Sequence, residues 1–159
     1  MFGLLRQLSN WYEKHYTINV GIAAFLFVWQ VVHLYWLTTD VVFLKLFGTS
    51  FFDAKGLWEY ILIVVDYTEI PALISTSIIY IHGLTKKFVW KNIWFLIFIN
   101  SQWLHLFWIT DEFVIKQFSS EVATLPLWLA WFAIFIDYLE LPVIYDTIKK
   151  FFASLRKSV

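Results

Sequence analysis

The sequence predicts an all-α integral membrane protein, a four-helix bundle made of two tandem helical hairpins. Three observations predict this fold. The 159 residues are 60% hydrophobic with a mean hydropathy of +0.68, whereas soluble domains are about 45–50% apolar. The chain contains four apolar runs of membrane-spanning length, and its second half repeats the polar motifs of its first half. We therefore expect a single transmembrane domain that covers residues 1–159.

The four apolar runs are the predicted transmembrane helices, because a helix needs about 20 mostly apolar residues to cross about 30 Å of hydrocarbon. These runs lack the alternation of polar and apolar residues that is typical of barrel strands. The first run is longer than a signal-peptide core and no small-residue cleavage site follows it, so we expect it to be retained. The predicted spans are residues 17–39, 57–82, 88–110 and 125–148.

Residues 1–16 place apolar side chains at helical spacing, which predicts an amphipathic segment at the bilayer surface. Basic residues predict the orientation, since nine Lys and Arg lie on the side of both chain ends and three lie on the opposite side. Positive charge is retained in the cytoplasm, so both termini are predicted to be cytoplasmic. The nine are Arg6, Lys14, Lys86, Lys87, Lys91, Lys149, Lys150, Arg156 and Lys157, and the three are Lys45, Lys55 and Lys116.

Two polar motifs occur twice and define an internal repeat. The first repeat covers about residues 17–83 and the second about residues 88–150. Because each repeat holds two spans, both point in the same direction, and a pseudo-two-fold axis is expected along the membrane normal. The paired motifs are "WQVVHLYWLTTD" (29–40) with "SQWLHLFWITDE" (101–112), and "VVDYTEIPALI" (64–74) with "FIDYLELPVIY" (135–145).

The repeated polar residues are predicted to lie at one depth in the membrane. At 1.5 Å per residue, His33 lies about 10 Å below the outer boundary, Asp66 about 14 Å and Glu69 about 18 Å. A charge that faces lipid at such a depth costs at least about 2.5–3.5 kcal/mol, so we expect these side chains to face the bundle interior. The same layer is predicted to hold Gln30 and the second-repeat residues Gln102, His105, Asp137 and Glu140.

Two prolines, Pro71 and Pro142, each follow a glutamate of this layer by two residues. Each removes a backbone donor and is expected to bend its helix near the carboxylates.

The predicted interior carries more negative charge than its own residues balance. No Lys or Arg lies at this depth in any span, and four clustered carboxylates cannot all stay ionised in a low-dielectric bundle without protons or cations. Two histidines with four carboxylates are also the ligand set of ferritin-like di-iron and di-manganese bundles, although their order along the helices differs here. We therefore predict an intramembrane centre for a divalent transition metal, iron or zinc, with a dinuclear form favoured. The predicted ligands are His33, Asp66, Glu69, His105, Asp137 and Glu140.

Other residues are expected to complete this centre. The four carboxylates named above are also the candidate catalytic groups, and Gln30 and Gln102 are the predicted hydrogen-bond partners of the imidazoles. The candidate cofactor-binding residues around the ligands are Gln30, Gln102, Tyr67, Tyr138, Trp36 and Trp108.

The composition limits the function classes. Iron at the centre would favour oxidation or hydroxylation of a lipid-soluble substrate, and zinc a structural or hydrolytic role. Membrane lipids are the expected surroundings. The net charge of zero gives no basic face for nucleic acid, and the absence of cysteine excludes disulfides and thiolate ligands. Glycine-rich phosphate loops, Ser-His-Asp arrangements and HExxH motifs are missing from the sequence, so soluble-type hydrolase chemistry has no support.

Several alternatives stay open for the same residues. A metal-free polar network would hold the helices together at about 0.6–2 kcal/mol per contact, and a proton or ion pathway would depend on Glu69 and Glu140. His15 and His82 have no repeat partners, and we interpret both as interfacial residues without a role. The acids at the outer helix ends are interpreted as helix-end solvation in preference to the mouth of an entrance; they are Asp40, Asp111 and Glu112.

The motifs "HLYWLTTD" (33–40) and "DYTEIP" (66–71) resemble the EXPERA class of membrane proteins, which includes sterol isomerase and the sigma-2 receptor. The resemblance covers the topology of most of the chain, a compact helical membrane bundle with acids inside the fold. It implies a pocket for a sterol-like or other lipidic ligand. Under this resemblance Asp66, Glu69 and His33 would be acid–base or amine-binding groups in place of metal ligands.

Overall fold

The computed structural model describes residues 10–52, 56–109 and 126–156, and every regular element in these ranges is helical. A short helix covers residues 10–14. The elements that follow are α2 (Tyr16–Trp36), the π-helix η1 (Leu37–Val42), α3 (Phe43–Phe47), α4 (Leu57–Tyr67), α5 (Glu69–Lys86), α6 (Trp90–Ile109), α8 (Leu127–Tyr138) and α9 (Glu140–Leu155).

The first predicted span is longer than expected. Helix α2 continues through η1 and α3, so that helical structure runs from Tyr16 to Phe47 and stops at Gly48, whose φ of 71° favours glycine. Helical structure therefore continues eight residues beyond residue 39, the predicted end of this span. The Thr38 and Thr39 hydroxyls donate to the carbonyls of Leu34 (2.7 Å) and Tyr35 (2.9 Å). Hydrogen bonds of this type often bend a helix, and here they accompany the π-helix η1.

The second and fourth predicted spans are each divided in two. The divisions fall at Thr68, between α4 and α5, and at Leu139, between α8 and α9. Pro71 and Pro142 each lie in the first turn of the second half of a divided span, where proline is tolerated. Because proline has no backbone N–H, neither residue can donate the helical hydrogen bond to the carbonyl four residues earlier. The break therefore precedes each glutamate, whereas the sequence predicted a bend beside it.

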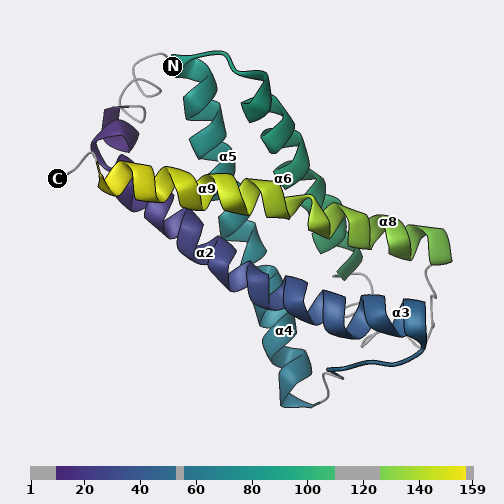
Figure 1. Ribbon diagram of the computed structural model, residues 1–159. Coiled ribbons are helices and arrows are strands. Elements are labelled where there is room, and N and C mark those ends of the chain that lie inside the picture. The colour runs from purple at the N-terminus through teal and green to yellow at the C-terminus, as the bar shows by residue number, and fades with distance from the viewer. Residues whose placement is uncertain (1–9, 53–55, 110–125, 157–159) are drawn as a thin grey trace.

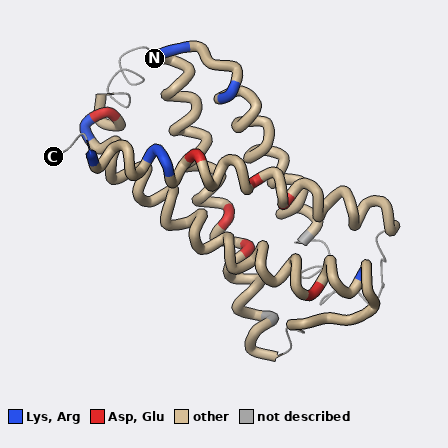
Figure 2. The backbone as a smooth tube through the Cα atoms, in the orientation of Figure 1, with Lys and Arg blue, Asp and Glu red and all other residues tan. Residues whose placement is uncertain are grey.

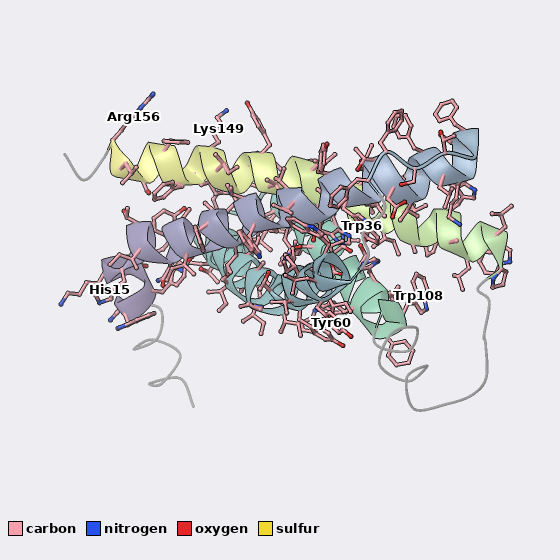
Figure 3. The ribbon with its side chains drawn as sticks, turned by 90° about the horizontal axis from the view of Figure 1, so that it is seen from below. His15, Trp36, Tyr60, Trp108, Lys149 and Arg156 are labelled. Atoms are coloured by element: carbon pink, nitrogen blue, oxygen red, sulfur yellow. The ribbon has the colours of Figure 1, made fainter. Side chains whose placement is uncertain are left out.

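Four long helical segments pack around a common core. Helix α2 packs against α9 and α5, α5 packs against α6, and α6 packs against α8 and α9. Figure 1 shows α2 and α9 side by side, with the start of α2 and the end of α9 at the same end of the molecule. In the view of Figure 3, α2 lies between α9 and the helices α4, α5 and α6. The core side chains come from all four segments and include Phe27, Leu73, Tyr80, Ile99 and Val143.

Three helical segments of the described chain are long and apolar enough to cross a membrane: Tyr16–Phe47, Tyr60–Lys86 and Leu127–Leu155. Helix α6, the third predicted span, has the length with 20 residues, but its Asn, Ser, Gln and His side chains lower its hydropathy. The outer surface of the helices is rich in exposed apolar side chains, of which Phe25, Phe107 and Tyr145 are each at least 70% exposed. Such a surface is typical of helices in contact with lipid.

Charged residues divide along the length of the helices. Most of the basic residues gather at the end where α2 begins and α9 ends, and a group of acidic residues lies in the middle (Figure 2). Of the predicted surface segment 1–16, residues 1–9 lie outside the described residues. Tyr12 of this segment is buried and packs against the His82 ring at 4.9 Å between ring centroids, while Trp11 is exposed.

Candidate metal centre

All six predicted ligands are buried, and none is more than 9% exposed. The two helix breaks position the acids, since each aspartate lies in the last turn before a break and each glutamate is the first residue after it. The histidines come from the two unbroken helices, α2 and α6. The six side chains are His33, Asp66, Glu69, His105, Asp137 and Glu140.

Each histidine approaches the aspartate of its own repeat through the same nitrogen. His33 Nδ1 lies in close contact with Asp66 Oδ1, and His105 Nδ1 lies 3.0 Å from Asp137 Oδ1. The two repeats thus build equivalent His–Asp pairs.

The two halves also meet each other at this point. His33 Nε2 lies 3.8 Å from Asp137 Oδ2, and the two imidazole rings are 5.6 Å apart between centroids at an interplanar angle of 74°. Asp137 consequently faces both histidines, whereas Asp66 is paired with His33. The two aspartates therefore differ in their contacts with the histidines.

The two glutamates lie beside these pairs. Their carboxyl groups interact directly with each other, and both interact electrostatically with Asp137. The lysines that form ion pairs in the described chain, Lys86, Lys91 and Lys150, do so with acids other than the predicted ligands. The ion-paired lysines of the described chain therefore do not neutralise the carboxylates of the site.

The polar atoms of the site lie close to one another in the buried interior. Eight nitrogen and oxygen atoms of the six side chains form no hydrogen bond of regular geometry. A cation would bind the carboxylate lone pairs and the lone pair of each imidazole nitrogen that carries no proton. The eight atoms are His33 Nδ1 and Nε2, Asp66 Oδ1, Glu69 Oε1, His105 Nδ1 and Nε2, Asp137 Oδ2 and Glu140 Oε1.

Three of the predicted ligands form the most compact set. His33, His105 and Asp137 each offer one ligand atom, and these atoms all lie within 4.8 Å of one another. Two imidazoles and one carboxylate fit zinc, iron and manganese, and such a three-residue set leaves a position for water or substrate. Asp66, Glu69 and Glu140 surround this triad.

The two glutamines act differently from the prediction. Gln30 Nε2 donates to the Val65 carbonyl (2.9 Å) and to Thr68 Oγ1 (3.1 Å), and Gln102 Nε2 donates to the Ile136 carbonyl (2.8 Å). The glutamine amides thus bind backbone carbonyls at the helix breaks in place of the imidazoles. These carbonyls also accept from the backbone N–H groups of Thr68 (3.0 Å) and Leu139 (2.9 Å), so no unpaired acceptor in the sequence pointed to the glutamines.

The aromatic residues predicted around the ligands are divided between the site and its margins. The Trp36 ring lies 5.8 Å from the His33 ring, and its indole N–H donates to Asp40 (3.1 Å). Asp40 lies within η1, four residues after Trp36. Trp108 packs against Phe132 at 6.4 Å. Asp111 and Glu112 lie outside the described residues.

The tyrosines lie next to the breaks. Tyr138 precedes the second break, and its hydroxyl lies 2.7 Å from the hydroxyl of Thr38 in η1. This contact joins the two halves, and sequence reasoning missed Thr38. Tyr67 is half-buried and ends α4.

Comparison of the chain with protein-family models, with curated proteins and with solved structures finds no match. The chemistry of the site is consequently argued from its geometry.

Proposed function

We propose that the chain is an integral membrane protein with four spans and cytoplasmic termini, and that its centre binds a divalent transition metal inside the membrane. Three apolar segments of spanning length and the 20 residues of α6 support the four spans. The basic residues at the end shared by the start of α2 and the end of α9 support the orientation (Figure 2).

The two halves are proposed to be tandem hairpin repeats. The support is the recurrence of three features at matching positions: the helix break before the glutamate, the Nδ1-to-aspartate contact, and the glutamine bond to a carbonyl at the break. A pseudo-two-fold axis would bring the two His–Asp pairs together at the centre of a four-helix bundle.

The single observation that carries the metal proposal is the convergence of two imidazoles and one carboxylate in a buried site, with one ligand atom of each within 4.8 Å of the others. His33, His105 and Asp137 hold the first ion in this proposal. Asp66, Glu69 and Glu140 complete a second position or hold protons beside the first. Zinc held by these residues would supply activation of water for hydrolysis. Iron would supply oxidation of a lipid-soluble substrate, with dioxygen as the external oxidant. Glu69 and Glu140, which touch each other at the edge of the triad, are suited to accept and return the protons of either reaction.

Element analysis of the full-length protein tests the proposal. We expect one or two ions of zinc, iron or manganese per chain after purification in detergent without chelator, and less than about a tenth of an ion in the double variant His33→Ala/His105→Ala, because a ligand pair is lost. The matched control is His15→Ala/His82→Ala, which removes two histidines away from the ligand cluster and should keep the metal. A metal-free wild type whose unfolding is unchanged by added zinc or iron would contradict the proposal.

A metal-free centre that shares protons is the second candidate, favoured by the direct contact between Glu69 and Glu140. This candidate predicts proton flux in liposomes that contain the protein. It also predicts that Glu69→Gln or Glu140→Gln abolishes the flux. The lipid-binding role implied by the EXPERA resemblance also requires no metal, so the element analysis separates both from the leading proposal.

A further inference from the structure

A pocket of about 310 Å³ lies at the basic end of the helices, and it is separate from the candidate metal centre. Its walls come from α2, α5, α6 and α9 and from the residues before α2. The volume is at the lower end of the range for small-molecule sites, about 300–1,000 Å³. The polar lining includes Glu13, Tyr16, His82, Lys86, Asn92 and Lys150.

Ammonium groups outnumber carboxylates around this pocket. Lys86 pairs with Glu13, while Lys91 and Lys150 both pair with Asp146. The pocket itself is lined by two lysines, Lys86 and Lys150, and by one acid, Glu13. Each ammonium has three donors and is shown to use one on a carboxylate.

Asp146 and Glu13 each have partners within the protein, and neither carboxylate blocks the pocket. Asp146 is buried and also accepts a hydrogen bond from Tyr80 Oη (2.9 Å). Glu13 is exposed on the pocket rim, and its hydrogen bond with Lys86 lowers its pKa, so it remains ionised and keeps Lys86 over the pocket. The Lys86 and Lys91 side chains remain more than half exposed.

The location of the pocket indicates which class of ligand it suits. The pocket lies between helix ends at the basic side, where the headgroups of a bilayer would lie in the proposed orientation. Basic pockets between transmembrane helices at this level bind anionic lipid headgroups. The apolar wall contributed by Ile79 and Tyr16 suits the glycerol and upper acyl part of a lipid.

We infer that this pocket binds the phosphate group of an anionic phospholipid through Lys86, Lys150 and Asn92. The site depends on the proposed membrane insertion and is independent of the metal centre. A free phosphate compound presents the same chemistry, and the experiment distinguishes the two sources.

The test titrates the detergent-purified full-length chain with dioctanoyl phosphatidylglycerol, dioctanoyl phosphatidylcholine or inorganic phosphate, and follows the Tm. A ligand that binds the folded state raises the Tm saturably. We expect saturable stabilisation by phosphatidylglycerol and none by phosphatidylcholine. Lys86→Gln and Lys150→Gln should each weaken binding about fivefold, the factor that corresponds to about 1 kcal/mol per lysine.

The matched control is Lys149→Gln, which removes the same charge from the residue next to Lys150. The Lys149 side chain projects away from the other helices (Figure 3), so this variant should bind as the wild type does, and Lys86→Arg should retain binding. Lys86 is exposed, so its exchange tests the site even where Lys150→Gln unfolds. Saturable stabilisation by inorganic phosphate with the same variant dependence would support the phosphate site and identify a soluble source. Equal stabilisation by phosphatidylcholine, or equal losses in Lys149→Gln and Lys86→Gln, would overturn the inference.

Discussion

At the scale of single residues, the decisive feature is the unequal position of two aspartates that the repeat makes equivalent. Asp137 faces both imidazoles, with Oδ1 3.0 Å from His105 Nδ1 and Oδ2 3.8 Å from His33 Nε2. Asp66 is paired with His33 Nδ1. A carboxylate on the outer nitrogen of a ligating histidine orients the ring without binding the metal. In the proposed metal centre, we therefore assign Asp66 to the orientation of His33, and Asp137 to the metal, because its second oxygen faces His33 Nε2.

Isosteric exchange of each aspartate tests this assignment. Asp137→Asn should remove nearly all bound metal, whereas Asp66→Asn should weaken metal binding about 10–100-fold and leave the site loadable at high metal concentration. The measurement is competition with a chromogenic chelator together with element analysis. The two variants control for each other, because they make the same chemical change at matching positions of the repeats. Equal losses would instead indicate a symmetric centre with two equivalent ions.

The burial of the six candidate ligands could be predicted from the sequence because intramembrane charge is costly and each residue occurs in both copies of the repeated motifs. The pairing of these side chains with one another could not be predicted from the sequence. Whether Asp137 reaches one histidine or two depends on ring orientations that differ between the halves, and a repeat in sequence carries no information about that difference. The partners of Gln30 and Gln102 were missed for a related reason, since the acceptors are main-chain carbonyls, which every residue has.

At the scale of elements, an ionic cluster ties three helices together at the basic end. Tyr80 of α5 donates to Asp146 of α9, and Lys91 of α6 and Lys150 of α9 contact the same carboxylate. The Lys150 ammonium also lies 4.0 Å from the centre of the Tyr80 ring. None of these residues has a chemical equivalent in the other repeat, so the cluster belongs to this end alone and nothing in the duplicated motifs pointed to it.

Removal of one hydroxyl tests the strength of this cluster. Tyr80→Phe keeps the ring and its contact with Lys150 but removes the donor to a charged carboxylate, a bond worth about 1.5–3 kcal/mol. We expect the free energy of unfolding in mixed micelles to fall by that amount. Tyr145→Phe is the control, because Tyr145 lies on α9 with 71% of its surface exposed and should change stability little. A similar effect of both exchanges would contradict a role for the Tyr80 hydroxyl.

The helices themselves show which features of an element can be predicted. Four apolar runs and two proline-associated distortions were visible in the sequence, and all four runs contain long helical segments. The π-helix η1 was not predicted, because it depends on the hydroxyls of Thr38 and Thr39 bonding back to carbonyls, and the same residues are common in regular helices. The π-helix lies within the first helical segment, which runs for 32 residues from Tyr16 to Phe47.

At the scale of the whole molecule, the number of membrane crossings decides on which side of the membrane the C-terminal end lies. The segments Tyr16–Phe47, Tyr60–Lys86 and Leu127–Leu155 have the hydropathy of spans, whereas α6 combines spanning length with polar residues. Gln102 and His105 of α6 are buried against the other helices, so the residues that lower its hydropathy would not face lipid. A polar residue buried in protein does not prevent a helix from crossing the membrane. We therefore expect α6 to cross and the C-terminal end to lie on the same side as the loop between α5 and α6.

Accessibility of single cysteines tests this topology, and the chain suits the method because it contains no cysteine of its own. Lys87→Cys lies directly after α5 and Arg156→Cys directly after α9, and both should react with a membrane-impermeant maleimide from the cytoplasmic side only. Thr49→Cys, just after α3, should react from the opposite side only. With three crossings instead of four, Arg156→Cys would react from the side of Thr49→Cys, because each crossing exchanges the sides. That result would place α6 outside the membrane. It would also separate His105 from the other five ligands in depth, so the intramembrane metal centre depends on Lys87→Cys and Arg156→Cys reacting from one side.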